Sequence, residues 1–391
     1  MIESIYVGMT GLSSFSRGLR VIANNTTNLN TPGFKGSSLR FADAFYSNGS
    51  YSGHQFGQLG YGVSTTGTMM SFKPGELRQT GNGLDLAIDG QGLFTLRGED
   101  GKITYTRAGQ FQFNSDGILV NQGTGEKVMG VGTDGKLTEI SIANRRTNAG
   151  KPTTAIKFTG NLSSTGTDQT INNVRVIDSA GGEHTLSLKF TNTNTTTAGS
   201  WQVDLMDGTT VVGTKQLIFQ NGKATAATEK LSFTYTPAGQ SAQALTLDFS
   251  TDVTSFASGT LSTLAFASQD GFAPAGLSSA AFDATGTLVL TYANGQTEKG
   301  VRLSLGRFDT PEAVGALGSN QFEVLDGSAW HTGVAGTDFG SVRSGYIEIS
   351  NVDLSQEFSD LVIMQRGYQA SSQVISTANE MLQELFSMKS R

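Results

Sequence analysis

Large, mostly apolar side chains recur at every seventh position near the C-terminus of this 391-residue chain. The row consists of Leu354, Leu361, Tyr368, Ile375 and Leu382, and Met364, Ala378 and Leu385 lie three positions after members of it. A seven-residue repeat places its members on one side of an α-helix and is typical of coiled-coil packing. Asn351 and Asp353 precede the row and are residue types that cap helix N-termini. We therefore expect a long C-terminal helix that packs against a partner.

A second apolar stripe lies near the N-terminus, on Ile5, Leu12, Phe15, Leu19 and Ile22. Its spacing keeps these side chains on one helical face, although Gly8, Gly11 and Gly18 each weaken a helix by about 1 kcal/mol relative to Ala. Either stripe alone could belong to an ordinary amphipathic helix packed on its own domain. Because termini are usually frayed and polar, stripes at both ends favour helices that pair with each other and with other subunits.

The stretch ANNTTNLNTPGFK, residues 23–35, ends the first stripe with turn-forming residues. Asn side chains compete for backbone hydrogen bonds, and proline disfavours helix at the residue before it. We expect a joint here, through which the chain leaves its helical layer. The residues assigned to this joint are Asn24, Asn25, Asn28, Thr31, Pro32, Gly33 and Phe34.

Between the two stripes the pattern changes to the two-residue period of β-strands. Residues 84–122 alternate apolar and polar side chains between glycine-rich segments that are typical of hairpin turns. The octapeptide FNSDGILV at 113–120 is similar to FDATGTLV at 282–289, which indicates one β domain built from two separated parts of the chain. The intervening segment is rich in Thr, Ser and Ala and predicts a self-contained antiparallel barrel or sandwich.

These patterns predict a mainly β fold with long α-helical termini and discontinuous, nested domains. The 50 glycines and the charged fraction of 15% are typical of a β-rich protein with many turns. We expect a coiled-coil-like terminal helical pair, an extended linker, a central β domain and an inserted outer β domain, the two β domains resembling barrels or sandwiches. The expected boundaries are, in that order, 1–30 with 350–391, 31–70, 71–148 with 282–349, and 149–281.

Composition argues against several classes of function. The net charge of −6 disfavours nucleic-acid binding, because such proteins usually carry a basic face. The absence of cysteine excludes disulfides, thiol catalysis and Cys-ligated metals. The first residues lack the pattern of a cleaved secretory signal, and no apolar stretch is long enough to predict membrane insertion. A protein of this kind that leaves the cell would do so without such a signal.

No catalytic, metal or cofactor site is expected from the sequence. The three histidines are far apart and have no metal-ligating neighbours at helical or strand spacing. In DLAIDGQG (85–92) and EDG (99–101), which resemble paired carboxylates, Asp89 and Asp100 each precede a glycine, as in ordinary turns. The glycines of residues 81–92 do not open a helix, so they do not predict a phosphate-binding loop.

Several segments together resemble the axial proteins of the bacterial flagellum, the family of rod and hook subunits. The joint residues 23–35 are similar to the N-terminal signature of that family, with Thr27 in place of the usual Ala. Residues 344–375 resemble its C-terminal signature, which is carried here by Ser350, Asn351, Val352, Asp353, Gln365, Arg366, Tyr368, Gln369 and Ala370. Residues 84–94 and 104–120 resemble the first half of its central β domain.

The resemblance implies a structural protein, not an enzyme, that polymerises head to tail into a hollow tube outside the cell. Both helical stripes would line the inner tube, and Phe41 and Phe45 of FADAF would contact the export gate. The implied partners are other copies of this chain, the rod, the hook cap, the hook–filament junction proteins and the flagellar type III export apparatus. No nucleic acid and no membrane insertion are expected. Phe41 and Phe45 are equally plausible as packing residues.

Within this family the inserted β segment favours a hook subunit over a distal rod subunit, because the rod subunits are shorter. A hook must bend while it transmits torque, and the Thr/Ser/Gly-rich surface of the insertion would suit weak contacts that shift register. Two other classes remain open. A β-rich extracellular adhesin or fibre protein with coiled-coil ends would form a closed trimer, and a secreted hydrolase would bring paired acidic residues together in one cleft.

Limited proteolysis of the monomer tests the expected role of the termini. Narrow apolar stripes stabilise a solitary helix pair poorly, so we expect both ends to be digested and a core of about residues 70–345 to resist. Mass spectrometry of the digest identifies the boundaries. Ends that resist as well as the core would contradict this expectation.

Overall fold

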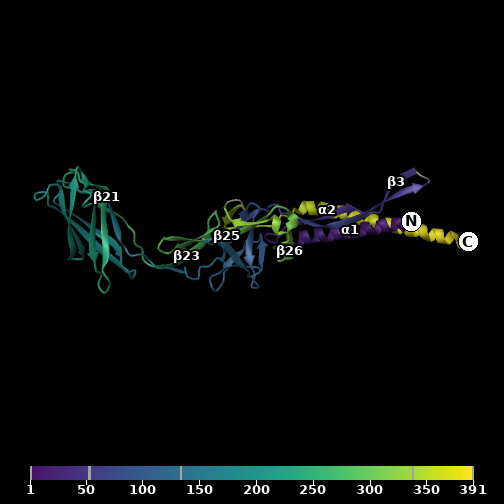
Figure 1. Ribbon diagram of the computed structural model, residues 1–391, viewed down its shortest axis with the longest axis horizontal. Helices are drawn as coiled ribbons and strands as arrows, with labels where there is room; N and C mark the ends of the chain where they lie inside the picture. The colour runs from purple at the N-terminus through teal and green to yellow at the C-terminus, as the bar shows by residue number, and fades with distance from the viewer. Residues whose placement is uncertain (1, 52–53, 133, 337–338, 390–391) are drawn as a thin grey trace. The chain divides into compact units, whose positions relative to one another are not determined.

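The computed structural model describes residues 2–51, 54–132, 134–336 and 339–389. The chain divides into two compact units. Unit 1 contains residues 1–143, 280–290 and 298–391, and unit 2 contains residues 144–279 and 291–297. Both units are built from β-strands, and the two long helices α1 and α2 belong to unit 1 (Figure 1). The predicted mainly β fold with helical termini is confirmed.

Unit 1 begins and ends with a helix and carries its strands between them. Its helices are α1 (Ile2–Thr27), η1 (Pro311–Ala313), η2 (Gly327–Ala329) and α2 (Leu354–Lys389). Its N-terminal strands are β1 (Ser37–Asp43), β2 (Tyr46–Tyr51), β3 (His54–Gly60), β4 (Val63–Met70), β5 (Leu77–Gln79), β6 (Leu86–Asp89), β7 (Leu93–Arg97), β8 (Ile103–Thr106), β9 (Phe111–Phe113), β10 (Leu119–Asn121), β11 (Lys127–Val131) and β12 (Leu137–Glu139). Its C-terminal strands are β26 (Val314–Gly318), β27 (Gln321–Val324), β28 (Trp330–Val334), β29 (Ser341–Ser344) and β30 (Tyr346–Glu348).

The strands of unit 2 follow one another with few interruptions. They are β13 (Thr147–Asn148), β14 (Ala155–Asn161), β15 (Asp168–Ile177), β16 (Glu183–Asn192), β17 (Ser200–Asp207), β18 (Thr210–Gln220), β19 (Lys223–Ala224), β20 (Lys230–Tyr235), β21 (Gln243–Thr254) and β22 (Ala265–Gln269). Three further strands each include residues of both units, namely β23 (Ala275–Phe282), β24 (Thr287–Tyr292) and β25 (Thr297–Phe308).

The long helices begin and end where the local chemistry predicts. Helix α1 ends at Thr27, inside the Asn-rich stretch, as expected. Helix α2 begins after Asp353, whose Oδ1 accepts hydrogen bonds from the backbone N–H of Ser355 at 2.8 Å and of Gln356 at 3.3 Å. Asp353 is therefore the N-cap. The expectation that Asn351 also caps this helix is wrong, because its side chain is bonded to segments far away in the sequence.

Residues 31–70, which we expected to form an extended linker, contain paired strands instead. Strand β1 pairs with β4 in antiparallel register, with Ser37 opposite Met70, and β2 pairs with β3. Phe72, just after β4, packs edge-on against Phe308 with ring centroids 4.5 Å apart. The segment is therefore fixed by a backbone ladder and by the core of unit 1, which the weak local pattern of its sequence did not reveal.

The β domain of unit 1 joins two distant parts of the chain in one sheet. Strand β7 pairs with β8, β11 and β25, so that Phe94 lies opposite Leu305. The two similar octapeptides adopt the same turn. The side-chain Oδ1 of Asn114 accepts from the N–H of Ile118, and that of Asp283 accepts from the N–H of Thr287, each four residues on. In each octapeptide a glycine lies three residues after this Asn or Asp. Its φ is 76° at Gly117 and 71° at Gly286.

Unit 2 encloses its own apolar core. Alternate residues of each strand point inward, as along β16, where the buried side chains are Leu186, Leu188 and Phe190. This core also contains Trp201, which is 2% exposed. The barrel- or sandwich-like architecture is confirmed, but it is not wholly antiparallel, because β14 runs parallel to β21. Parallel neighbours need a long connection, and here strands β15–β20 form it.

The shared turn predicts a stability difference between two glycine variants. Gly286→Ala would force an L-residue into a left-handed φ and bring its Cβ to 2.5 Å from the Ala335 side chain. Gly101 has φ of 81° with open space around it, so Gly101→Ala is the matched control. We expect Gly101→Ala to cost about 1–2 kcal/mol of unfolding free energy and Gly286→Ala to cost more, as measured by urea unfolding. Equal losses of unfolding free energy in the two variants would show that the contact with Ala335 adds nothing to the cost of the left-handed φ.

Candidate functional site

Helices α1 and α2 pack closely because glycines line the side of α1 that faces α2. A Cβ built on Gly8 would lie 2.8 Å from Ile375 Cγ1, and one built on Gly18 would lie 2.8 Å from Met364 Sδ. Helix α2 also contributes a glycine to this contact, because a Cβ built on Gly367 would lie 2.5 Å from the Phe15 ring of α1. The glycines that weaken α1 as an isolated helix therefore allow the second helix to approach.

The structure places only part of the predicted heptad row in this contact. Leu361, Ile375 and Leu382 are half-buried, whereas Leu354 is 36% exposed and Tyr368 is 37% exposed. The seam instead passes through Gly367, one position earlier than Tyr368. The other α2 residues that α1 contacts are Met364, Ser371 and Ile375, each three or four positions from the next residue of this set with Gly367. On α1, Ile22 is buried, and the other predicted residues, Ile5, Leu12, Phe15 and Leu19, are half-buried.

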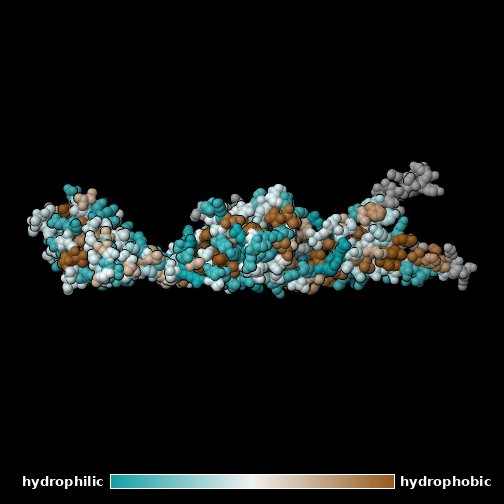
Figure 2. Space-filling view, turned by 60° about the horizontal axis from the view of Figure 1, so that its bottom comes forward, coloured by the Kyte–Doolittle hydropathy of each residue, from teal (hydrophilic) through white to brown (hydrophobic). Residues whose placement is uncertain are grey.

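Many large apolar side chains of both helices remain uncovered in the single chain. On α2 the exposed ones are Phe358, Val362, Ile363, Val374, Met381, Leu385, Phe386 and Met388. On α1 they are Ile2, Tyr6 and Met9. Figure 2 shows apolar surface gathered along the outer parts of these helices. A patch of this kind marks a surface that another molecule covers.

At the joint, Asn25 connects three segments through one buried side chain. Its Nδ2 donates to Glu357 Oε1 of α2 and to the carbonyl of Ser37 in β1, both at 2.8 Å. Its Oδ1 accepts from the N–H of Ser37 at 3.0 Å. Asn25 is only 2% exposed, whereas its partners Ser37 and Glu357 are half-buried. The end of α1 is thereby fixed to the start of α2 and to the first strand.

The remaining joint residues form a compact turn after α1. Asn28 Nδ2 donates to the carbonyl of Asn24 at 2.9 Å, and Thr31 Oγ1 donates to Asn28 Oδ1 at 3.0 Å. The carbonyl of Pro32 accepts from the side chain of Asn320 in the β domain at 2.8 Å. These bonds fix the direction in which the chain leaves the helix.

Two further joint residues lie directly against the β domain. Gly33 has φ of 72°, and a Cβ there would lie 2.5 Å from the backbone nitrogen of Ala108. Only glycine therefore fits this approach without movement of the backbone. Phe34 is half-buried and closes the turn, because its N–H donates to the carbonyl of Thr31 at 3.2 Å.

A buried charged cluster follows the joint and ties it to the start of α2. Glu348, at the end of β30, accepts from Lys35 Nζ at 2.6 Å through one carboxylate oxygen and from Arg107 Nε through the other. The Arg107 guanidinium also donates to the carbonyls of Ile88 and Gly90, each at 2.7 Å. The three charged side chains are at most 3% exposed.

The charges in this cluster alter its titration. Burial by itself would raise the pKa of the Glu348 carboxyl, but the adjacent Arg107 and Lys35 hold this pKa below its usual value of 4.5. Burial lowers the pKa of Lys35, and the nearby Arg107 lowers it further, although Glu348 acts in the opposite direction. One buried carboxylate thus compensates two buried cations, and it must be ionised to do so.

Asn351 completes the connection between the joint and α2. Its Oδ1 accepts from the N–H of Gly36 at 2.8 Å, and its Nδ2 donates to the carbonyls of Ser71 at 2.7 Å and Lys73 at 2.9 Å. The sequence did not predict the roles of Lys35, Arg107 and Glu348, which are separated by up to 313 positions. Lys35 lies in the N-terminal signature, but nothing in its sequence context names a partner.

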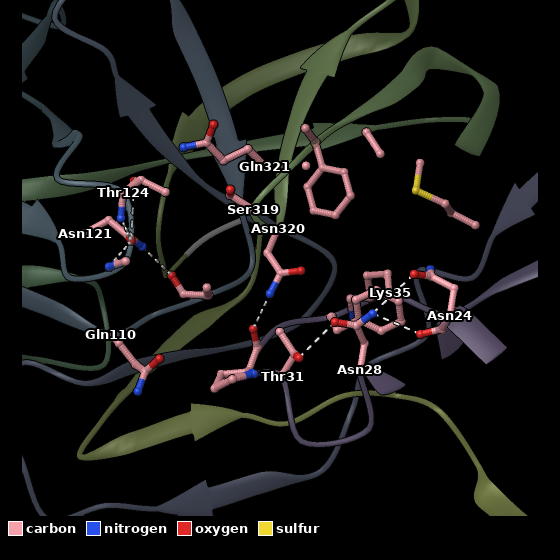
Figure 3. Close-up of a pocket in the computed structure, with 18 of the residues that line it drawn as sticks. Asn24, Asn28, Thr31, Lys35, Gln110, Asn121, Thr124, Ser319, Asn320 and Gln321 are labelled. Carbon is pink, nitrogen blue, oxygen red and sulfur yellow. Dashed lines mark hydrogen bonds between the residues drawn. The ribbon is translucent and has the colours of Figure 1, made fainter. Parts of the chain in front are cut away.

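A polar hollow with a volume of about 560 Å³ lies beside the joint. It is lined on one side by Asn24, Asn28 and Thr31 and on the other by Gln110, Asn121 and residues 318–322 of the β domain (Figure 3). Asn320, which projects into the region between them, donates to Pro32 across the turn. The hollow therefore lies where the terminal segment meets the β domain.

Of the two phenylalanines of FADAF, Phe41 lies on β1 and Phe45 lies in the connection between β1 and β2. The Phe41 ring packs on Phe15 of α1 with centroids 5.9 Å apart. The Phe45 ring stacks on Tyr61 with centroids 4.6 Å apart. Both remain partly exposed, at 39% and 56% respectively. In the folded chain these rings are packing residues, which leaves their export role a prediction.

Among the residues that the structure describes, no group of three or more His, Cys, Asp or Glu side chains converges as metal ligands do. His184 is paired with Asp178 at 2.8 Å and His331 with Asp309 at 2.9 Å, each a two-residue contact. Within the described ranges, no helix has the length and apolar character needed to cross a lipid bilayer.

Comparison with known proteins identifies the family. Models of three flagellar families match the chain: flagella basal body rod protein at residues 5–35, the D1 domain of the flagellar hook protein FlgE/F/G at 87–163, and the C-terminal domain of flagellar basal body rod FlgEFG protein at 343–388. The flagellar hook protein FlgE of Escherichia coli K12 is 30% identical, over 97% of this chain and 98% of that protein. The chain belongs to the flagellar hook protein family.

Other relatives extend the similarity. The flagellar hook protein FlgE of Borreliella burgdorferi is 26% identical over the full length of both chains. The crystal structure of the Helicobacter pylori flagellar hook protein FlgE2 aligns with a TM-score of 0.52 at 14% identity, covering 71% of this chain and all of that one. The flagellar resemblance inferred from the terminal signatures is confirmed, and the structural match supports the fold.

Replacement of the buried carboxylate tests the charged cluster. Glu348→Gln keeps the size of the side chain but leaves Lys35 and Arg107 buried without a counter-charge. We expect the unfolding free energy of unit 1 to fall by about 3–5 kcal/mol. The chain has two tryptophans, Trp201 in unit 2 and Trp330 in unit 1, so Trp330 fluorescence in a Trp201→Phe background reports urea unfolding of unit 1 alone.

The control and the pH dependence complete this test. Glu323→Gln removes the partner of Lys102, 2.8 Å away at the surface, and we expect no measurable shift of the urea midpoint.

Because the folded pKa of Glu348 is depressed, the contribution of this carboxylate to the unfolding free energy is complete above pH 4.5 and is lost as the pH falls through the folded pKa. The difference between wild type and Glu348→Gln should therefore shrink on acidification. A constant difference would exclude titration of Glu348 as its source.

Proposed function

We propose that this chain is the structural subunit of the flagellar hook and acts without catalysis. Copies would join head to tail through unlike surfaces into a hollow, curved tube, because heterologous contacts that do not close a ring generate helical polymers. The tube would serve as a flexible joint that transmits torque from the rod to the filament. The full-length similarity to hook proteins supports a hook subunit over a rod subunit.

The observation that carries this proposal is the uncovered apolar surface of the terminal helices. Phe358 and Val362 of α2 are each 53% exposed although α1 packs on the opposite side of that helix, and Phe386, farther along α2, is 66% exposed. Burial of a large apolar side chain contributes about 1.5–3 kcal/mol, so several of them would stabilise contacts with neighbouring copies. The helical seam residues predicted from the sequence would then form the inner tube together with these exposed ones.

The joint would connect this inner tube to the outer layers. Asn25, the Glu348 cluster and Asn351 fix one end of the helix pair to the β domain. Toward its N-terminus α1 keeps two longer hydrogen bonds, from Tyr61 Oη to Glu3 Oε1 at 3.5 Å and from the N–H of Val63 to Thr10 Oγ1 at 3.3 Å. The far ends of both helices would be ordered further by neighbouring copies. The domains would then form layers, with the terminal helices innermost, the β domain of unit 1 outside them and the inserted domain outermost.

We also propose the partners and the route of export. The chain would reach the outside of the cell through the flagellar type III apparatus and would contact the rod, the hook cap and the hook–filament junction proteins in addition to itself. Phe41 and Phe45 pack on Phe15 and Tyr61 in the folded chain. The export gate would therefore contact these two residues before the chain folds.

Electron microscopy of the concentrated, full-length chain tests the proposed assembly. We expect open, hollow helical tubes, since the contacts are heterologous. A closed trimer would instead support the extracellular adhesin or fibre protein.

A second micrograph, of the chain without about residues 150–280, separates the roles of the domains. We expect this variant to form stiffer or straighter tubes, whereas a complete loss of assembly would contradict an inner tube built by the helices.

A further inference from the structure

A hollow between helix α1 and the ribbon of strands β1 and β4 carries two arginines. Its volume is about 490 Å³, and the residues that line it include Arg17, Arg20 and Val21 of α1 and Leu39 and Thr65 of the ribbon. Arg17 Nη1 donates to Thr65 Oγ1 at 2.6 Å, which directs this guanidinium toward the ribbon. Within the ranges that the structure describes, no carboxylate pairs with either arginine. The hollow therefore offers two exposed positive charges beside half-buried apolar side chains.

The last turns of α2 carry the opposite charge. Glu380 and Glu384 lie about one turn apart and are exposed, on the side of α2 away from Ile375, which packs on α1. We call them the acidic pair. Met381 and Phe386 beside them are both more than half exposed. Charge is also segregated along the sequence, because residues 367–388 include no basic residue and residues 4–42 include no acidic one.

Within one chain the acidic pair is too far from the arginines to reach them. Gly18, next to Arg17, faces Met364 of α2. At about 1.5 Å of helix per residue, Glu380 and Glu384 lie about 25–30 Å farther along the helix pair than Met364. The C-terminal end of α2 also continues past the start of α1, so α1 leaves these last turns uncovered (Figure 1). Both charged surfaces are therefore open to other molecules.

We propose that the acidic pair of one copy docks at Arg17 and Arg20 in the hollow of a second copy. The occupant is a second copy because its charge and its apolar surface complement those of the hollow, in the manner of an amphipathic helix laid in a groove. This inference rests on the proposed polymer and adds the contact that fixes how far each copy is displaced from the next, about 25–30 Å along the helix pair.

The same contact can repeat without limit. The acidic pair and the hollow are different surfaces, so a copy that uses its hollow still has a free acidic pair for the next, and the series does not close on itself. Exposed ion pairs alone contribute little to affinity. Here the contact would also bury Met381 and Phe386, which supply the hydrophobic part of the binding energy, while the charges set direction and register.

Cross-linking within the assembled protein tests this contact. The chain has no cysteine, so Thr68→Cys in the hollow and Gln383→Cys beside Glu384 introduce the only thiols and leave all four charges in place. In polymers of the double variant, a short bismaleimide should link successive copies into a ladder of covalent oligomers, whereas each single variant should remain uncross-linked. Links in Gln383→Cys alone would reveal a contact between two acidic pairs, and no links in the double variant would exclude the docking; either result overturns the proposal.

Reversal of the charges gives a second measurement, the critical concentration for tube formation. The variant with Glu380→Lys and Glu384→Lys should raise it about tenfold or more, and so should the variant with Arg17→Glu and Arg20→Glu, because like charges then meet. The variant with all four substitutions again brings opposite charges together. Its critical concentration should return toward the wild-type value, which a mere folding defect would not do.

The control changes the net charge by the same amount elsewhere. Glu99→Lys with Asp116→Lys alters two exposed turn residues of the β domain and should leave the critical concentration unchanged. Reversed variants that assemble at the wild-type concentration, or a fourfold variant that assembles no better than they do, would overturn the docking and leave the hook assignment intact. A wild-type chain that forms no tubes would overturn both.

Discussion

The ionised carboxylate of Glu348, buried between Lys35 and Arg107, is the interaction on which the arrangement of unit 1 depends. These three charges lie on the segment after α1, on the end of β8 and on the strand before α2. Each would be costly to bury alone, so the three segments are stable only when they are assembled together. The Asn25–Glu357 and Asn351–Gly36 hydrogen bonds reinforce the same connection from the helical side. The point at which the terminal helices meet the β domain is thus a polar, tightly specified joint.

The helix pair that leaves this joint follows a different physical rule. Glycines on α1 allow α2 to approach, at the cost of intrinsic helix stability, and much of the apolar surface of both helices faces outward. The seam between the two helices covers only one side of each. The combination of a specified joint and uncovered helices suits a subunit whose ends become ordered as copies assemble. In unit 2, by contrast, the strands enclose a complete apolar core of their own.

Much of this fold could be predicted from local patterns. The two terminal helices, the strands of unit 2 and the repeated turn at Asn114 and Asp283 follow from periodicity and turn chemistry within short windows of sequence. The strands of residues 37–70 were missed because their pairing depends on contacts with the core, such as that of Phe72. Tyr368 was assigned to the seam from its place in the seven-residue repeat, whereas the contact with α1 uses Gly367.

The sequence by itself determined the family, through its two terminal signatures, and the order of helical and β segments, since both are encoded by neighbouring residues. The candidate site was predicted only where it is local, as at the Asn-rich turn. Only the tertiary structure decided that Glu348 accepts from both Lys35 and Arg107 and that Asn351 binds Gly36 instead of capping α2. The physical reason is that these contacts join residues far apart in the chain, and their energies depend on burial that the folded arrangement alone creates.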